Sequence, residues 1–194
     1  MKKSPFIFDI NAPFILGMTA LSLVMLIISA NVGINTRSIF AAYRTSITDP
    51  MQYIRLFTHV VVHADVSHYV GNFMMILAIG PIVEEKYGSV RLLKMAAITS
   101  VITGLVIVIF FPRTAVVGAS GIVFMIILLA SFTNIRQGRI PVTVPLVAIL
   151  YIGNEIMLGL FTVSNISRIS HIVGGLCGAL FGIIFHSHIL NNRK

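Results

Sequence analysis

Six long apolar runs divide the chain, and they restrict it to folds that sit in a membrane. The runs fall at residues 13–32, 66–83, 92–111, 116–134, 141–162 and 169–187. A transmembrane helix needs about 20 mostly apolar residues, so each run is long enough to cross a bilayer. Only 10% of the residues are charged, against about 25% in a soluble domain, so the apolar surface is too large for one buried core. The sequence therefore predicts an all-α membrane protein with six transmembrane helices in the lipid bilayer.

The gaps between the runs are too short to hold a second domain. The longest gap covers residues 33–65, so we expect a single membrane domain over residues 1–194. The first run is too long for the core of a signal peptide, and no A-x-A-like cleavage site follows it. We therefore expect this run to be retained as a helix.

The basic residues indicate the orientation of the bundle. With the N-terminus inside, the inner side holds Lys2, Lys3, Lys86, Arg91, Lys94, Arg136, Arg139, Arg193 and Lys194. The outer side holds Arg37, Arg44, Arg55, Arg113 and Arg168. Because basic residues concentrate on the cytoplasmic side, we expect both termini in the cytoplasm and a plasma or inner membrane location. The net charge of +8 comes without a basic cluster interleaved with aromatic residues, so no nucleic-acid partner is expected.

Four polar residues lie at one depth in this arrangement. The second, fourth and sixth runs all begin on the outer side, and their first turns carry His68, Asn72, Ser120 and His171. Polar side chains at membrane depth are costly and usually face the interior of the bundle or a water-filled cavity. Their common depth indicates a functional site.

Glycines favour close contact between the fourth and sixth helices. Four residues of the sixth run share one helical face: His171, Gly174, Gly178 and Gly182. On the fourth run, Gly118 and Gly121 lie beside Ser120. Glycines let membrane helices approach closely. If these faces meet, His171 comes within reach of Ser120 and can take the proton of its hydroxyl.

His68 and Asn72 stand four residues apart and share a helical face. Both side chains can donate hydrogen bonds, as an oxyanion pocket requires. A structural alternative exists for each residue, because serines in membrane helices usually bond to their own backbone and glycine stripes usually serve packing. The shared depth and the matching faces favour a joint catalytic role.

Three stretches resemble the rhomboid family of intramembrane serine proteases: "HVVVHADVSHYVGN" (59–72), "GASG" (118–121) and "SHIVGGLCGALFG" (170–182). They follow the order of the family, on the second, fourth and sixth predicted helices, and six helices are the family's minimal form. The resemblance implies a six-helix bundle of the rhomboid type. It also implies a serine endopeptidase whose partners are transmembrane protein substrates.

The resemblance implies a role for individual residues. Ser120 would be the nucleophile and His171 the general base of a dyad, with His68, Asn72 and the Ser120 backbone N–H as the oxyanion pocket. In "VEEKYGS" (83–89), Glu84 matches a structural glutamate of the family. Arg55 matches the arginine of a Trp-Arg pair in the first loop.

The chain departs from the family at three positions. Ile54 stands where the tryptophan of that pair is usual, and Ser170 replaces an alanine before the base. Phe124 stands where relatives often carry a tyrosine; it can stack on the His171 ring but offers no hydroxyl. None of the three departures removes a catalytic group.

His59 and His63 are spaced to bind a metal ion on one helix. No glutamate completes an H-E-x-x-H pattern, so we expect neither a metal nor another cofactor, and a structural role for both histidines. On one continuous helix they would face away from the oxyanion pair. We therefore expect a break near Asp65, with Asp65 or Ser67 as the N-cap of the second long helix.

Other functions remain open at this level. A non-catalytic rhomboid-like protein that binds membrane helices is the main alternative, although such relatives usually lack the serine or the histidine. A small transporter is less well supported, because the runs show no inverted repeat. Glu155, the one acid deep in a run, can either orient the site or bond within its own helix.

Overall fold

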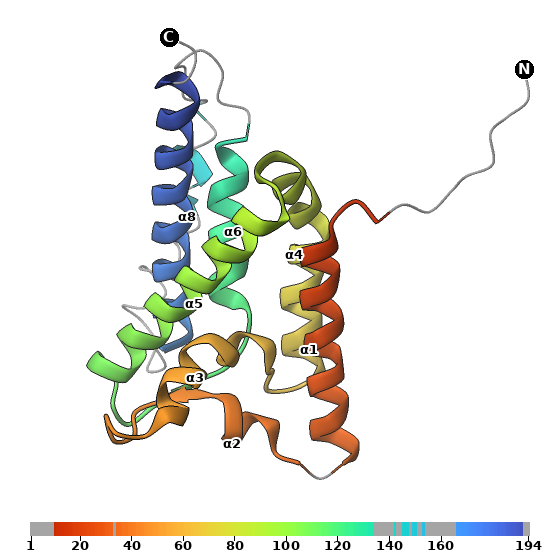
Figure 1. The fold of residues 1–194 in the computed structure, drawn as a ribbon, viewed down its shortest axis with the longest axis vertical. Coiled ribbons are helices and arrows are strands. Elements are labelled where there is room, and N and C mark those ends of the chain that lie inside the picture. Colours follow the sequence, from red (N-terminus) through yellow and green to blue (C-terminus); the bar gives the residue numbers. More distant parts are fainter. Residues whose placement is uncertain are drawn as a thin grey trace, which may run out of the picture.

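The computed structural model describes residues 10–32, 34–133, 142, 145–147, 149–150, 153 and 166–191. Four helices in these ranges are long and apolar enough to cross a membrane: α1 (Pro13–Asn31), α4 (Val66–Tyr87), α5 (Ser89–Phe110) and α8 (Ile166–Asn191). Figure 1 shows α1 beside α4 and α6 (Ser120–Ser131) beside α8 along the long axis. The fifth predicted helix, 141–162, falls largely outside the described residues, so the count of six stays a prediction.

The N-terminus of α1 is capped by a residue from another helix. The N-cap residue Ala12 offers no side-chain acceptor to the first-turn amides. Instead, the buried Glu84 of α4 accepts hydrogen bonds from Phe14 N at 2.8 Å and from Ile15 N at 3.0 Å. A carboxylate satisfies these amides and complements the positive end of the helix dipole. Glu84 thereby joins α1 to α4, which fits the structural role implied for it.

We expect Glu84→Ala to destabilise the protein by about 1–3 kcal/mol, because two buried amides would lose their acceptor. The neighbouring Glu85 is exposed, so Glu85→Ala is a control with the same loss of charge. Thermal unfolding in detergent should show a lower midpoint for Glu84→Ala alone. Equal midpoints for the two variants would contradict the capping role.

The first loop is folded rather than irregular. It contains α2 (Thr36–Phe40), β1 (Ala42–Tyr43), α3 (Pro50–Thr58) and the 3-10 turn η1 (His59–Val61). The buried Arg55 donates from Nε to Ile39 O at 2.9 Å, pairs with Asp49 at 3.4 Å and lies 4.3 Å over the ring of Tyr43. Arg55 therefore holds three parts of the loop together, while Ile54 beside it is exposed.

The predicted break before α4 is confirmed. The 3-10 turn ends at Val61 and α4 begins at Val66, with Asp65 as its N-cap. The Asp65 carboxylate accepts a hydrogen bond from His68 N at 2.8 Å, which satisfies one free amide of the first turn. This cap fixes where His68 lies on α4.

The fourth predicted helix, 116–134, has the wrong boundaries. Residues Ala115–Val116 form strand β2, which pairs antiparallel with β1, and Gly118 has a φ of 107° that no helix accommodates. The helix α6 has 12 residues, about 18 Å, too short for a hydrocarbon core of about 30 Å. Most of its residues are buried. A short buried helix places its first residue, Ser120, inside the bundle rather than at its surface.

Candidate active site

Ser120 is the first residue of α6 and is 8% exposed. The turn before it depends on Gly118, whose φ of 107° disfavours any other residue. A Cβ atom at Gly118 would lie 2.6 Å from Cε1 of His68 and 3.4 Å from Nδ2 of Asn72. The two polar side chains of α4 thus lie directly against the peptide that leads into Ser120.

Asn72 has a donor ready for a ligand. Its side chain is buried, and its Nδ2 has no hydrogen-bond partner among the residues that the structure describes. An unsatisfied buried donor costs free energy, so it calls for a functional explanation. Its position beside Gly118 makes it available to an oxygen atom that approaches Ser120. This is the property expected of an oxyanion donor.

The first loop holds the turn before Ser120 in place. Gly118 N donates to His59 O at 2.9 Å, and Ala119 N donates to Nε2 of His63 at 3.3 Å. The His63 ring also packs edge-on against the His68 ring, with centroids 5.2 Å apart. Both histidines therefore have a structural role, as expected. Among the described residues, no group of three or more His, Cys, Asp or Glu side chains is arranged to hold a metal ion.

Burial keeps both loop histidines neutral near pH 7. It lowers the pKa of His59 from 6.5 to about 4. The pKa of His63 is also lowered to about 4, by burial first and by the nearby His68 second. Neutrality matters at His63, because Nε2 can accept the Ala119 amide only when it carries no proton.

Stability should consequently fall in acid. Well above pH 6.5 both histidines are neutral in the folded and the unfolded chain, and their contribution to stability is complete. As the pH falls from 6.5 towards about 4, the unfolded chain binds protons that the folded chain does not, so the free energy of unfolding decreases. His63→Gln cannot be protonated, and its Oε1 can still accept from Ala119 N.

We expect His63→Gln to lose less stability than the wild type between pH 7.5 and pH 5, as measured by thermal unfolding. His63→Ala should be less stable than His63→Gln at both pH values, because it leaves the Ala119 amide without an acceptor. Parallel pH curves for the wild type and His63→Gln would show that His63 is not a source of the acid sensitivity.

The glycine stripe of α8 faces α6. A Cβ atom at Gly174 would collide with Gly121 O, and one at Gly178 would collide with Met125 O. A Cβ atom at Gly121 would in turn lie 3.3 Å from Ser170 O. The two backbones are therefore in direct contact, which the sequence predicted from the glycine spacing.

The contact between the two helices brings His171 of α8 against α6. The His171 ring stacks on Phe124, with centroids 4.3 Å apart and an angle of 8° between the planes. Phe124 lies one turn after Ser120 on α6, so the base candidate rests on the helix that begins with the nucleophile candidate. His68 of α4 lies against Gly118, two residues before Ser120. Residues from α4, α6 and α8 thus converge on one place.

Two predicted residues lie away from this place, and one lies outside the described residues. Arg55 organises the first loop and Glu84 caps α1, so both act on the fold. Glu155 falls outside the described residues. Sequence reasoning did not find the hydrogen bond between His63 and Ala119, because the two are 56 positions apart and no local pattern links them.

Comparison with known proteins agrees with this arrangement. The family model of the Rhomboid domain matches residues 50–188. The Rhomboid protease GluP of Bacillus subtilis (strain 168) is 31% identical over 146 residues. The match covers 73% of this chain but 28% of that protein, so the chain spans well under half of the relative's length.

Proposed function

The chain belongs to the rhomboid family, and from this premise we propose that it is an intramembrane serine endopeptidase. It would hydrolyse peptide bonds in or near the transmembrane helices of other membrane proteins. The observation that carries the proposal is the convergence of Asn72 and His68 on the turn before Ser120, with His171 stacked on the same helix. Because of the distribution of basic residues, we propose that both termini lie in the cytoplasm and that the site lies towards the outer side.

Ser120 and His171 would act as a dyad. His171 takes the proton of the Ser120 hydroxyl as the oxygen attacks the scissile carbonyl, and later gives that proton to the leaving amine. Water then enters, and His171 activates it to release the acyl group from Ser120. The stack on Phe124 fixes the plane of the imidazole through these steps. No metal or organic cofactor takes part.

The oxyanion of each tetrahedral intermediate would receive hydrogen bonds from Asn72 Nδ2, the His68 ring and the Ser120 backbone N–H. Asn72 suits this role because its buried amide is unpartnered among the described residues. Donors fixed in a poorly solvated site are stronger than in water and need no reorganisation during the reaction. Asn72 and His68 would thus stabilise the transition state rather than the bound substrate.

The main alternative is a non-catalytic relative that binds membrane helices. It shares the fold and the glycine contact, so only chemistry separates the two functions. A fluorophosphonate probe of active serines should label the purified wild type and should not label Ser120→Ala. Absence of labelling in a folded wild type that still binds a membrane helix would favour the non-catalytic function.

Activity should not depend on a metal ion. We expect cleavage of a membrane-helix reporter to be unchanged by EDTA, because the proposed dyad and its oxyanion donors need no metal. The control adds zinc back after chelation. Loss of cleavage in EDTA and its recovery with zinc would contradict the serine mechanism and point to His59 and His63 as ligands.

A further inference from the structure

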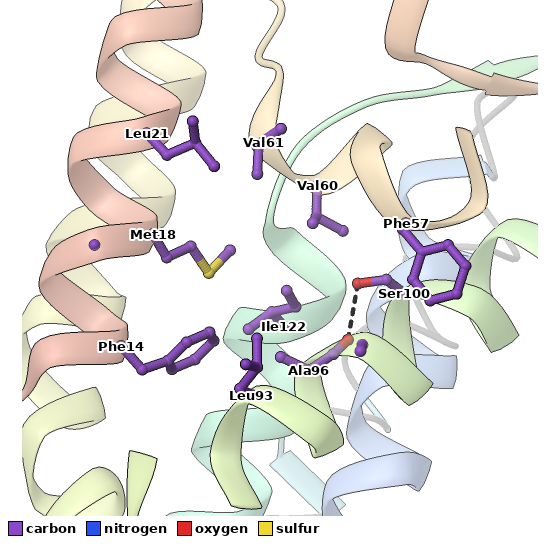
Figure 2. A pocket seen from close by; sticks show the side chains of 12 residues that line it. Phe14, Met18, Leu21, Phe57, Val60, Val61, Leu93, Ala96, Ser100 and Ile122 are labelled. Atoms are coloured by element: carbon purple, nitrogen blue, oxygen red, sulfur yellow. Dashed lines mark hydrogen bonds between the residues drawn. The ribbon is translucent and has the colours of Figure 1, made fainter. Parts of the chain in front are cut away.

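An apolar groove separates α1 from α5. Figure 2 shows Phe14, Met18 and Leu21 of α1 on one wall, Leu93 and Ala96 of α5 opposite, and Ile122 of α6 between them. Its volume is about 380 Å³. Small residues, Gly17 and Ala97 among them, create the space, and a Cβ atom at Gly17 would meet no atom within 4 Å.

The described lining of the groove offers no free polar side chain to a ligand. Among the described residues, Ser100 is the one polar side chain that lines it, and its hydroxyl already donates to Ala96 O at 2.8 Å (Figure 2). Apolar spaces of this kind exclude water and take apolar molecules. A space of 150 Å³ accommodates benzene, so 380 Å³ accommodates on the order of a dozen carbon atoms.

The groove opens where the protein faces lipid. Leu21, Phe57 and Leu93 at its walls are 51–53% exposed, on helices and a loop of an integral membrane protein. Only a small share of α1 is buried, and the groove lies between this helix and α5. The molecule that covers this surface in a membrane is a lipid, and its chain has the chemistry that the groove accepts.

Positive charge lies beside the groove. Lys94 is exposed and stands three residues before Ala97, so it is a neighbour of this lining residue on the surface of α5. Lys86 near the end of α4 and Arg91 near the start of α5 are also exposed, on either side of the turn that joins these helices. Glu85 is the one exposed acid among the described residues of this turn, since Glu84 is buried against α1. A lysine at this depth can extend its ammonium group to a lipid phosphate.

We propose that the groove between α1 and α5 binds one acyl chain of an anionic phospholipid, whose phosphate lies at Lys94. The lipid fills the space that the protein leaves between the two helices. It thereby acts as part of the bundle and joins α1 to the helices that surround the site. The proposal does not depend on the proposed proteolysis.

Native mass spectrometry of the purified protein with phosphatidylglycerol tests the groove. The wild type should bind one lipid saturably. Gly17→Phe and Ala97→Phe, which fill the groove from opposite walls, should each weaken binding about tenfold or more, because excluding even two methylene groups has that effect. Ala20→Phe adds the same side chain to an exposed position of α1 that does not line the groove, and it should bind as the wild type does.

Lys94→Gln tests the headgroup. The wild type should prefer phosphatidylglycerol to phosphatidylcholine, and Lys94→Gln should lose that preference while it still binds one lipid. The proposal is overturned if the wild type binds no lipid saturably, or if folded Gly17→Phe and Ala97→Phe bind like the wild type. It is also overturned if both variants leave lipid binding unchanged and instead raise KM for a membrane-helix reporter, since the groove would then hold substrate.

Discussion

Ser120→Ala and His171→Ala should each reduce cleavage of a membrane-helix reporter by roughly 10⁴-fold or more, as loss of a nucleophile or its base does in serine proteases. Ser120→Ala deletes one oxygen atom from a side chain that is 8% exposed. His171→Ala removes the ring stacked on Phe124. The two losses should not add, because the residues act as one unit, so the double variant should be about as slow as either single variant.

The matched control for the serine is on the same helix. Ser131, at the end of α6, donates its hydroxyl to Ile127 O at 3.2 Å and lies far along the helix from the site. Ser131→Ala should cleave the reporter at the wild-type rate. Thermal unfolding of every variant should show that the fold is intact. Wild-type-like cleavage by both Ser120→Ala and His171→Ala would end the protease proposal.

The features predicted correctly from the sequence follow from local geometry. Helical periodicity placed His171 and Gly178 on one face, and the structure has that face against α6. The same periodicity required a break in the helix before α4, and in the structure Asp65 caps the N-terminus of α4. Rules of this kind need only the spacing of residues within one helix, which the sequence gives directly.

The features that the sequence did not reveal depend on contacts between distant segments. Hydropathy extended the fourth helix back to residue 116 because Val116 and Val117 are apolar. The structure instead pairs Val116 with Ala42 and bends the chain at Gly118. Apolar composition cannot distinguish a strand residue in a buried loop from a helix residue in lipid. The bond from Ala119 N to His63 was missed for the same reason, because its partners are remote in sequence.

The second large effect is expected at Gly178, which touches no reacting atom. A Cβ atom there would collide with Met125 O and lie 2.9 Å from both C and Cα of Met125. These are backbone atoms of a buried helix, so they cannot move out of the way by a change of rotamer, as the end of a side chain can. Gly178→Leu must therefore push α8 away from α6. Gly178 lies seven residues, about two turns, from His171, and the displacement should reach the imidazole.

Cys177→Leu is the control for the added side-chain volume. Cys177 is buried too and receives the same new side chain, but it points about 100° around the helix from Gly178. Added volume at a buried position typically costs about 1–3 kcal/mol in stability. Cleavage by Cys177→Leu should therefore stay close to the wild type once the protein is folded.

For Gly178→Leu we expect a loss of about 10²-fold or more in kcat, since a misplacement of about 1 Å between reacting groups has that effect. KM should change less than kcat, because the displaced imidazole would act in the chemical step. The two variants should be compared at temperatures equally far below their unfolding midpoints, so that differences in stability do not affect the comparison of their rates. If they then turn over the reporter equally fast, the glycine stripe does not deliver His171 to Ser120. The contact of α6 with α8 would in that case serve packing alone, and another feature would have to position the base.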